Sequence, residues 1–208
     1  MGKMRGARKK HPNRVLCFHR DYFRNRCTLM NLSYTESKKD GENMNIKIQP
    51  EEIIVDDKLR LRKFDGNYKA FLEPYRDPYI CKMSEGIFDE NEAPDLEYVR
   101  KMCEYLSNAG ELYYIEMLEN GKFIPIGDVT VKDEHPPISI WYEGYRGKGI
   151  GTLVMKTVIS RLKALGFNKI YGTAIYKWNP ISQKMHETLG FIRVGETENE
   201  ILYELNIK

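Results

Sequence analysis

The sequence predicts a mixed α/β (α+β) fold with a mostly antiparallel central sheet flanked by helices. Two apolar runs, residues 112–118 and 123–131, are separated by four residues that contain Asn120-Gly121, a pair typical of a tight hairpin turn. Further along, residues 138–176 follow a strand–helix–strand order. A helix that connects two strands in this way indicates a parallel pair within the sheet.

Before the hairpin, residues 53–83 show no long regular pattern of apolar residues. Residues 53–64 alternate imperfectly between apolar and polar side chains, which predicts a strand. Residues 69–83 are interrupted by Pro74 and Pro78. Proline in a helix interior removes a hydrogen bond and clashes with the preceding turn, so only short helices are expected there.

A longer helix is predicted over residues 95–109. Asp95 is a suitable N-terminal cap, and Gly110 ends the segment. The apolar positions recur at helical spacing, which predicts one buried face. That face consists of Leu96, Val99, Met102, Cys103 and Leu106.

Strands and helices alternate after the hairpin. The helix that begins near Ile150 has a regular apolar face, and Gly166 supplies its expected left-handed end. The remaining predicted elements are strands over 138–142 and 169–176, a helix over 180–189, and final strands over 191–194 and 201–205.

Composition excludes several classes of protein. The chain is 41% hydrophobic and 30% charged, which is typical of a globular protein. No apolar run approaches the roughly 18 residues of a membrane span, and the basic start lacks the apolar segment of a secretory signal. Four cysteines without a Cys-x-x-Cys pair favour neither a disulfide framework nor a zinc site. We therefore expect a cytoplasmic protein with no metal and no membrane contact.

Charge divides the chain into two parts, a basic extension (residues 1–43) and one folded domain (residues 44–208). The extension holds eleven Lys or Arg against four acids, a net charge of about +7, which leaves about −4 for the domain. Three interpretations of the extension stay open: a disordered or loosely attached tail, an upstream extension of a reading frame that naturally starts at Met44, and a nucleic-acid-binding arm. Nucleic acid is the least favoured partner, because no recognised module frames the basic residues.

The most informative segment, residues 145–151, reads Tyr-Arg-Gly-Lys-Gly-Ile-Gly and lies between a predicted strand and a predicted helix. Glycines let the backbone approach a ligand closely, because they have no Cβ atom. The start of a helix presents unpaired N–H groups and partial positive charge, which suits a pyrophosphate. Arg146 and Lys148 would add full charges.

Three nucleotide loops must be distinguished from one another. A P-loop requires a Gly-Lys-Ser/Thr ending, but Gly151-Thr152 lacks the lysine. The dinucleotide fingerprint requires Gly-x-Gly-x-x-Gly, whereas the spacing here is Gly-x-Gly-x-Gly. What remains is Arg-x-x-Gly-x-Gly after an antiparallel hairpin, and a glycine-rich turn used only for packing stays an alternative at this point.

A second motif follows about thirty residues later. Asn179 opens a short helix, a small residue (Ser182) comes three positions on, His186 seven positions on, and Gly190-Phe191 closes it. The two motifs together resemble the GNAT superfamily of acetyl-CoA-dependent N-acetyltransferases. The resemblance covers roughly residues 50–208, and its distinctive motifs lie within residues 138–191.

The resemblance implies a GNAT-like sheet in which a parallel strand pair is splayed, with acetyl-CoA as co-substrate and no metal. The pyrophosphate is expected on backbone N–H groups of residues 147–152, and the pantetheine arm beside residues 139–142. A main-chain N–H there would polarise the thioester carbonyl. The coenzyme-binding residues are expected to be Ser139, Ile140, Trp141, Tyr142, Arg146, Gly147, Lys148, Gly149, Ile150, Gly151, Thr152, Asn179 and Ser182.

The catalytic residues are less well defined. His186 occupies the position where the family usually has a tyrosine that protonates the departing thiolate, and the alternative is that it only flanks the pantetheine. Ala174 stands where some members have a glutamate base, so Glu143 is the best local candidate for the base. Asp128 and Glu116 are weaker candidates. Cys81 and Cys103 are expected to be buried apolar residues rather than nucleophiles.

The predicted function is transfer of an acetyl group from acetyl-CoA to a primary amine, by direct attack in a ternary complex. The acceptor is a small-molecule or peptide amine that the sequence does not identify. The alternative is a non-catalytic acyl-CoA-binding or sensing module, because Ala174 and His186 depart from the family pattern. A homodimer is expected by analogy only.

Overall fold

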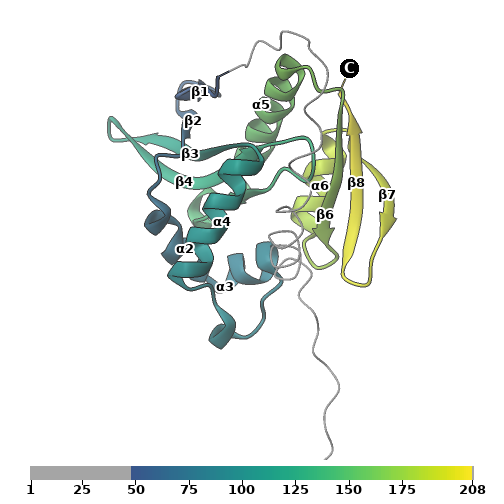
Figure 1. The fold of residues 1–208 in the computed structure, drawn as a ribbon, viewed down its shortest axis with the longest axis horizontal. Coiled ribbons are helices and arrows are strands. Elements are labelled where there is room, and N and C mark those ends of the chain that lie inside the picture. The colour runs from purple at the N-terminus through teal and green to yellow at the C-terminus, as the bar shows by residue number, and fades with distance from the viewer. Residues whose placement is uncertain (1–47, 208) are drawn as a thin grey trace, which may run out of the picture.

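The computed structural model describes residues 48–207, so the basic extension and Met44 lie outside the described residues. This part of the chain forms eight strands and nine helical elements (Figure 1). The strands are β1 (Glu52–Ile54), β2 (Leu59–Lys63), β3 (Glu111–Glu119), β4 (Lys122–Val131), β5 (Ile138–Ile140), β6 (Lys169–Tyr176), β7 (Ile192–Glu196) and β8 (Glu200–Asn206). The helical elements are η1 (Tyr68–Phe71), α2 (Leu72–Arg76), α3 (Pro78–Ile80), η2 (Cys81–Glu85), η3 (Glu90–Glu92), α4 (Leu96–Ala109), η4 (Glu143–Tyr145), α5 (Ile150–Leu165) and α6 (Pro180–Thr188).

The strands form two sheets. β1 to β5 make a five-stranded antiparallel sheet in sequence order, and the second sheet has the order β6-β8-β7, also antiparallel. The two sheets meet at one parallel bridge between Glu134 and Tyr171. The predicted mixed, mostly antiparallel fold is therefore confirmed, and the predicted parallel pairing is limited to this bridge.

His135 lies where the two sheets separate. Its N–H donates to the carbonyl of Tyr171 over 2.8 Å, which is one of the two hydrogen bonds that form this bridge. Its ring Nδ1 then accepts the N–H of Ala174 over 2.9 Å. Because a side chain takes this N–H, β6 does not need β5 as a hydrogen-bonding partner there, and the strands splay apart.

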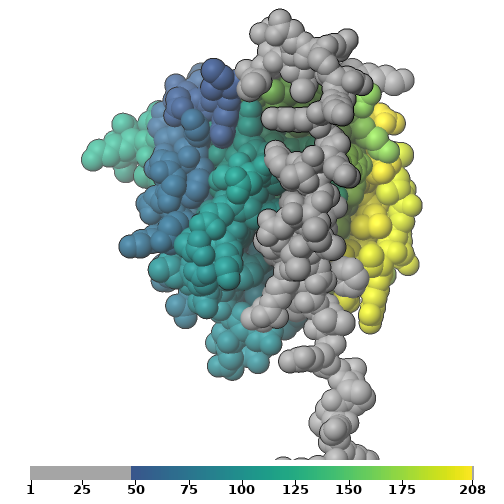
Figure 2. Space-filling view, in the orientation of Figure 1, coloured from purple at the N-terminus to yellow at the C-terminus, as the bar shows by residue number. Residues whose placement is uncertain are grey.

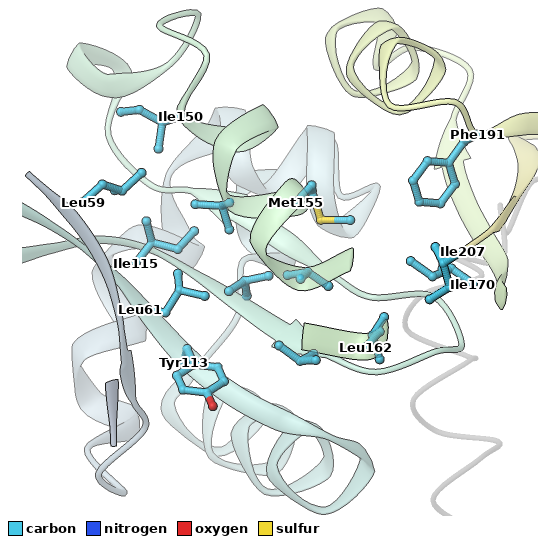
Figure 3. Close-up of a cluster of buried hydrophobic side chains, with 14 of the residues drawn as sticks. Leu59, Leu61, Tyr113, Ile115, Ile150, Met155, Leu162, Ile170, Phe191 and Ile207 are labelled. Atoms are coloured by element: carbon cyan, nitrogen blue, oxygen red, sulfur yellow. The ribbon is translucent and has the colours of Figure 1, made fainter. Parts of the chain in front are cut away.

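β3 is buried on both faces, and its alternating side chains enter two different cores. Tyr113 and Ile115 pack with α5 and side chains from both sheets, and Figure 3 shows this cluster. Leu112 and Tyr114 point the other way, into a second cluster with α4 and the short helices. Alternation along one strand thus places α4 and α5 on opposite faces of the five-stranded sheet.

The space-filling view shows the face covered by α4. In Figure 2 the N-terminal strands (blue) lie on one side of this face and the C-terminal strands (yellow) on the other, with α4 (teal) between them. Each fully buried Leu, Ile, Val or Phe in these cores contributes roughly 1.5–3 kcal/mol relative to exposure, so the cores fix the relative position of the two sheets.

The structure confirms the predicted hairpin turn, the N-terminal cap of α4 and the end of α5. Asn120 (φ 49°) and Gly121 (φ 77°) both adopt positive φ, as the hairpin turn requires. The Asp95 carboxylate accepts the N–H of Tyr98 over 2.7 Å and caps α4. Gly166 ends α5 in the left-handed conformation, with φ 97°.

The prediction of one strand over residues 53–64 is wrong. The Asp56 carboxylate accepts the N–H groups of Lys58 (2.8 Å) and Leu59 (2.9 Å), and this turn divides the segment into β1 and β2. The apolar face predicted for α4 is also only partly buried, since Leu96 is 38% exposed.

Candidate functional site

The glycine-rich loop before α5 forms an open cradle of N–H groups. Gly147 (φ 71°) and Gly149 (φ 81°) are both left-handed, a conformation that other residues adopt only with strain. The first hydrogen bond of α5 runs from the Leu153 N–H to the Gly149 carbonyl over 3.1 Å. The N–H groups of the three residues before Leu153 therefore have no acceptor in their own helix, which makes them available to an anion.

This cradle lines a cavity of about 360 Å³, which we call the loop cavity. It is bounded by the glycine loop, β5, α6 and the short helices α3 and η2. A Cβ atom added to Gly147 or Gly149 would meet nothing within 4 Å, so the backbone faces open space. The lining residues from the loop and α5 are Tyr145, Arg146, Gly147, Gly149, Ile150, Gly151 and Thr152.

A smaller cavity of about 100 Å³, the inner cavity, lies between the splayed strands. It is lined by β6 residues Thr173 to Tyr176, by the 132–139 segment and by η2. The two cavities share a wall made of Met83, Ser84, Ile138, Ser139, Asn179 and Ser182. The two cavities are therefore adjacent, and β5 runs along both of them.

β5 presents main-chain groups to this space. The Trp141 N–H donates to Ile126 (2.8 Å) and the Thr130 N–H donates to Pro137 (3.1 Å) across the β4–β5 pair. Along an antiparallel pair, hydrogen-bonded and non-hydrogen-bonded residues alternate. The N–H groups of Ile138 and Ile140 therefore point away from β4. Both residues line the loop cavity.

The structure brings most of the predicted coenzyme-binding residues together. Ten of them line the loop cavity: Ser139, Ile140, Arg146, Gly147, Gly149, Ile150, Gly151, Thr152, Asn179 and Ser182. The other three line neither cavity. Trp141 is buried in the α4 core, where its Nε1 donates to Asp128 over 2.7 Å, whereas Tyr142 and Lys148 are exposed.

Arg146 braces the loop against β5. Its Nε donates to the Ile140 carbonyl over 3.0 Å, and Nη2 donates to the Trp141 carbonyl. Its guanidinium carbon lies 4.0 Å from the centroid of the Tyr79 ring, and Asp77 lies 3.6 Å away. Most of the donor capacity of this side chain is thus used inside the protein, while the charge stays beside the cradle.

Asn179 joins α6 to the η2 segment. Its side-chain oxygen accepts the N–H of Ser182 over 3.0 Å and caps α6, and its Nδ2 donates to the Met83 carbonyl over 3.2 Å. Pro180 follows at the first helical position. The N-cap role expected for Asn179 is therefore present, and the same side chain forms part of the shared wall.

His186 is buried and lines the inner cavity. Its Nδ1 donates to the Ser182 carbonyl over 2.8 Å, which places the neutral ring's proton on Nδ1. Burial lowers the pKa of His186 below its usual 6.5, although the bond to Ser182 works in the opposite direction. The ring is therefore largely neutral at physiological pH, with a lone pair on Nε2.

The predicted bases lie at three different places. Glu143 is exposed in η4 and lines neither cavity. Glu116 is held by Arg60 (2.8 Å) and Arg62 (2.6 Å) in the β2–β3 pair. Asp128 is fully buried beneath β5, where Tyr75 and Trp141 donate to it. Burial raises the pKa of Asp128 to about 7.

Glu85 is a site residue that sequence reasoning missed. It is 4% exposed, lies at the end of η2 and lines the inner cavity. Burial raises the pKa of Glu85 to about 7, while a hydrogen bond from the Tyr98 hydroxyl acts against that rise. The only sequence signal is its position before Gly86, which ends η2 with a left-handed φ of 66°.

Polar atoms without partners also line the inner cavity. Within residues 48–207, Ser139 Oγ, Thr173 Oγ1 and His186 Nε2 are buried and form no hydrogen bond. Buried polar atoms are normally paired, so three such atoms around one cavity indicate that a ligand or water completes them.

Cys81 and Cys103 are buried, as expected from the sequence. Burial raises the pKa of both thiols, so neither is a ready thiolate nucleophile. The effect is stronger for Cys103, which α4 places inside the second core. Both residues therefore act as small apolar side chains.

Metal-binding clusters and membrane-spanning helices are both absent from residues 48–207. No group of three or more His, Cys, Asp or Glu side chains in this range is arranged to hold a metal ion. None of the helices described there is both long enough and apolar enough to cross a membrane. The cytoplasmic location stays a prediction.

A glycine loop at a helix start, beside two splayed strands, is an arrangement suited to binding a phosphate group. The sequence model of the acetyltransferase (GNAT) family matches residues 70–191, and the chain belongs to this family. It is thus an enzyme of the N-acetyltransferase class, as the two sequence motifs predict. No curated protein sequence matches the chain significantly.

Solved structures share the fold. A domain from Methanocaldococcus jannaschii is 26% identical, with a TM-score of 0.62 over 73% of this chain and 99% of that one. An N-acetyltransferase from Staphylococcus aureus is 21% identical, with a TM-score of 0.55 over 72% and 99%. YncA from Salmonella typhimurium, solved with its cofactor acetyl-CoA, is 17% identical, with a TM-score of 0.54 over 72% and 94%.

Proposed function

We propose that the protein transfers an acetyl group from acetyl-CoA to a primary amine by direct attack in a ternary complex. The observation that carries this proposal is the wall of six residues that the loop cavity and the inner cavity share. It gives an anion cradle at one end and a buried polar chamber at the other, with an exposed strand edge between them.

The residues of the loop cavity fit acetyl-CoA. The positive φ values of Gly147 and Gly149 and the empty space beside them suit close approach of a pyrophosphate to the backbone. The N–H groups that begin α5 would bind its oxygens, and Arg146 would add charge. The coenzyme supplies an activated acetyl thioester.

The strand edge would orient the thioester end. The Ile140 N–H, which points away from β4, is the best-placed donor toward an oxyanion on the acetyl carbonyl. One such donor contributes on the order of 3 kcal/mol at a transition state. Trp141 cannot serve in this way, because its N–H is already bonded to Ile126.

His186 and Glu143 are proposed as catalytic residues, and the structure supports His186 more strongly than Glu143. The Nε2 lone pair of His186 lines the inner cavity, so the neutral ring would accept or relay a proton rather than act as a standing acid. Glu143 is exposed and would act only through water, on the solvent side of the loop.

The acceptor is proposed to be a small-molecule or peptide amine, since an N-acetyltransferase transfers the acetyl group to an amine. Release of free thiol from acetyl-CoA over a panel of amines tests the proposal. Amine-dependent release supports it. Saturable acetyl-CoA binding without release on any amine would favour a non-catalytic acyl-CoA-binding module instead.

A further inference from the structure

Three contacts hold the η2 segment against β6 and α6. The Trp178 Nε1 donates to the Lys82 carbonyl over 2.9 Å, and the Asn179 Nδ2 donates to the Met83 carbonyl over 3.2 Å. Gly86 lies so close to β6 that an added Cβ would be 2.7 Å from the Tyr176 hydroxyl. These contacts flank Glu85 and hold its backbone at the wall of the inner cavity, which Glu85 lines.

The carboxyl group of Glu85 has a neutral hydrogen-bonding partner. The Tyr98 hydroxyl donates to it, and the nearby buried Asp128 receives the Tyr75 hydroxyl and the Trp141 indole N–H, which are also neutral. Among residues 48–207, no cation lies within ion-pair distance of Glu85 or Asp128. Of the two acids, Glu85 lines the chamber, and a buried acid without a counter-ion makes its wall attractive to a cation.

The other polar atoms of the chamber fit a small amine. Ser139 Oγ, Thr173 Oγ1 and His186 Nε2 all carry acceptor lone pairs and have no partner within the described range. An ammonium group carries three donors, so it would satisfy acceptors that the protein leaves open. The cavity volume of about 100 Å³ suits a narrow alkyl chain rather than a bulky group.

We propose that Glu85 binds the ammonium group of a small primary alkylamine acceptor and takes its proton before acetyl transfer. This inference rests on the proposed function, and it assigns to Glu85 the role of base that Ala174 does not supply. Glu85 is placed for it because it lines the inner cavity beside Ser139 and Asn179, where the coenzyme channel ends.

Protons and electron pairs balance in the proposed acetyl transfer. The ammonium gives one proton to the Glu85 carboxylate and becomes a neutral amine with a lone pair. The amine nitrogen forms a bond to the acetyl carbon, and the carbon–sulfur bond breaks as the coenzyme A thiolate leaves. The second proton on nitrogen goes to the thiolate, through His186 or water, and Glu85 returns its proton to solvent.

Several titratable groups surround Glu85 and affect its protonation. Those in electrostatic contact with it are Tyr75, Cys81, Tyr98 and Asp128. On the other walls of the chamber lie Tyr105, Lys132, His135, Tyr176 and His186. Burial raises the pKa of Glu85 to about 7, which is well suited to a base that cycles at neutral pH.

The test compares the wild-type protein with Glu85→Gln, which keeps the shape but cannot take a proton. The probes are ethylamine, n-butylamine and 1,5-diaminopentane, with acetyl-CoA as donor. We expect the kcat/KM of the wild type to rise with pH, with an inflection near pH 7. In Glu85→Gln, kcat/KM should be lower by about 100-fold or more, and the inflection should be absent. Calorimetry should show n-butylamine binding to the CoA-loaded wild type weakened at least tenfold in the variant.

Glu90→Gln is the matched control, since Glu90 is an exposed acid five residues away. It should keep wild-type rates, and acetyl-CoA affinity should stay within twofold in both variants. An unchanged pH profile and rate in Glu85→Gln would overturn the inference, as would wild-type acetyl-CoA binding without binding or turnover of any of the three amines. Failure of the wild type to bind acetyl-CoA would instead contradict the proposed function.

Discussion

Gly149 combines two requirements at a single residue. Its φ of 81° is strained for any side chain, and the residue lines the loop cavity, where an added Cβ would meet no protein atom within 4 Å. We expect Gly149→Val to weaken acetyl-CoA binding by at least 100-fold while costing on the order of 1–2 kcal/mol of stability. Calorimetric titration and urea unfolding measure the two effects.

Gly144→Val is the control for this change. Gly144 lies in η4, an added Cβ meets nothing within 4 Å, and the residue lines neither cavity. It should leave coenzyme affinity unchanged. Equal affinity in Gly149→Val and the wild type would show that the phosphates bind elsewhere.

His186 allows a test that separates chemistry from packing. Its ring packs edge-on against Phe191 at 4.8 Å between centroids, so His186→Gln should lower stability as well as activity. If the Nε2 lone pair relays a proton, kcat should fall at least tenfold with acetyl-CoA affinity within twofold. Equal losses in kcat and in affinity would indicate a packing role only.

At the residue scale, the local backbone structure could be predicted from the sequence where the signal is local. The glycines of the loop and the Asn179 cap are set by their own turn and helix start, so neighbouring residues are enough to find them. Glu85 could not be found in this way, because its burial depends on contacts with Tyr98 and with the segment around residue 178. Arg146 was found from the sequence, but the direction of its donors toward β5 could not be predicted from neighbouring residues.

At the scale of elements, the approach of β5 to β4 depends on Gly127. A Cβ at this position would lie 2.3 Å from the Ser139 carbonyl oxygen, a backbone atom that cannot move without displacing β5. We expect Gly127→Ala to cost roughly 2–4 kcal/mol in urea unfolding and to weaken acetyl-CoA binding. Gly195→Ala in β7 is the control, since its added Cβ would be 3.7 Å from the nearest atom, in Leu202. Equal stability of the two variants would contradict this account of the β4–β5 pair.

Element order was predictable because periodicity and breakers act over short distances. The hairpin, α4, α5 and α6 follow the expected ranges closely. The division of residues 53–64 was missed, since the Asp56 turn interrupts a pattern that reads as continuous. The extent of the parallel pairing also could not be predicted, because it depends on the ring of His135 binding the Ala174 N–H.

At the scale of the whole molecule, the two buried acids make stability depend on pH. Burial raises the folded-state pKa values of Glu85 and Asp128 to about 7, above those of unfolded carboxyls. The folded state therefore holds more protons than the unfolded state at neutral pH, and stability falls as pH rises. His186 has the opposite sign, but its effect is confined to pH values below about 6.5.

We expect the free energy of unfolding to fall between pH 6 and 8 by about 1.4 kcal/mol for each of the two acids. Asp128→Asn should remove about half of this slope, because it removes one titrating group. Urea unfolding at several pH values measures it. Stability that rises with pH over this window in the wild type would contradict the burial of uncompensated acids.

Sequence and structure agree on a mixed, mostly antiparallel fold for residues 48–207. The homodimer stays a prediction. The central claim is that the glycine loop at the start of α5 binds the pyrophosphate of acetyl-CoA. Calorimetric titration of the wild-type protein with acetyl-CoA, repeated with Gly149→Val, tests it most directly. We predict saturable one-to-one binding to the wild type that the variant loses. No heat of binding in the wild type, or equal binding in both proteins, would contradict the account.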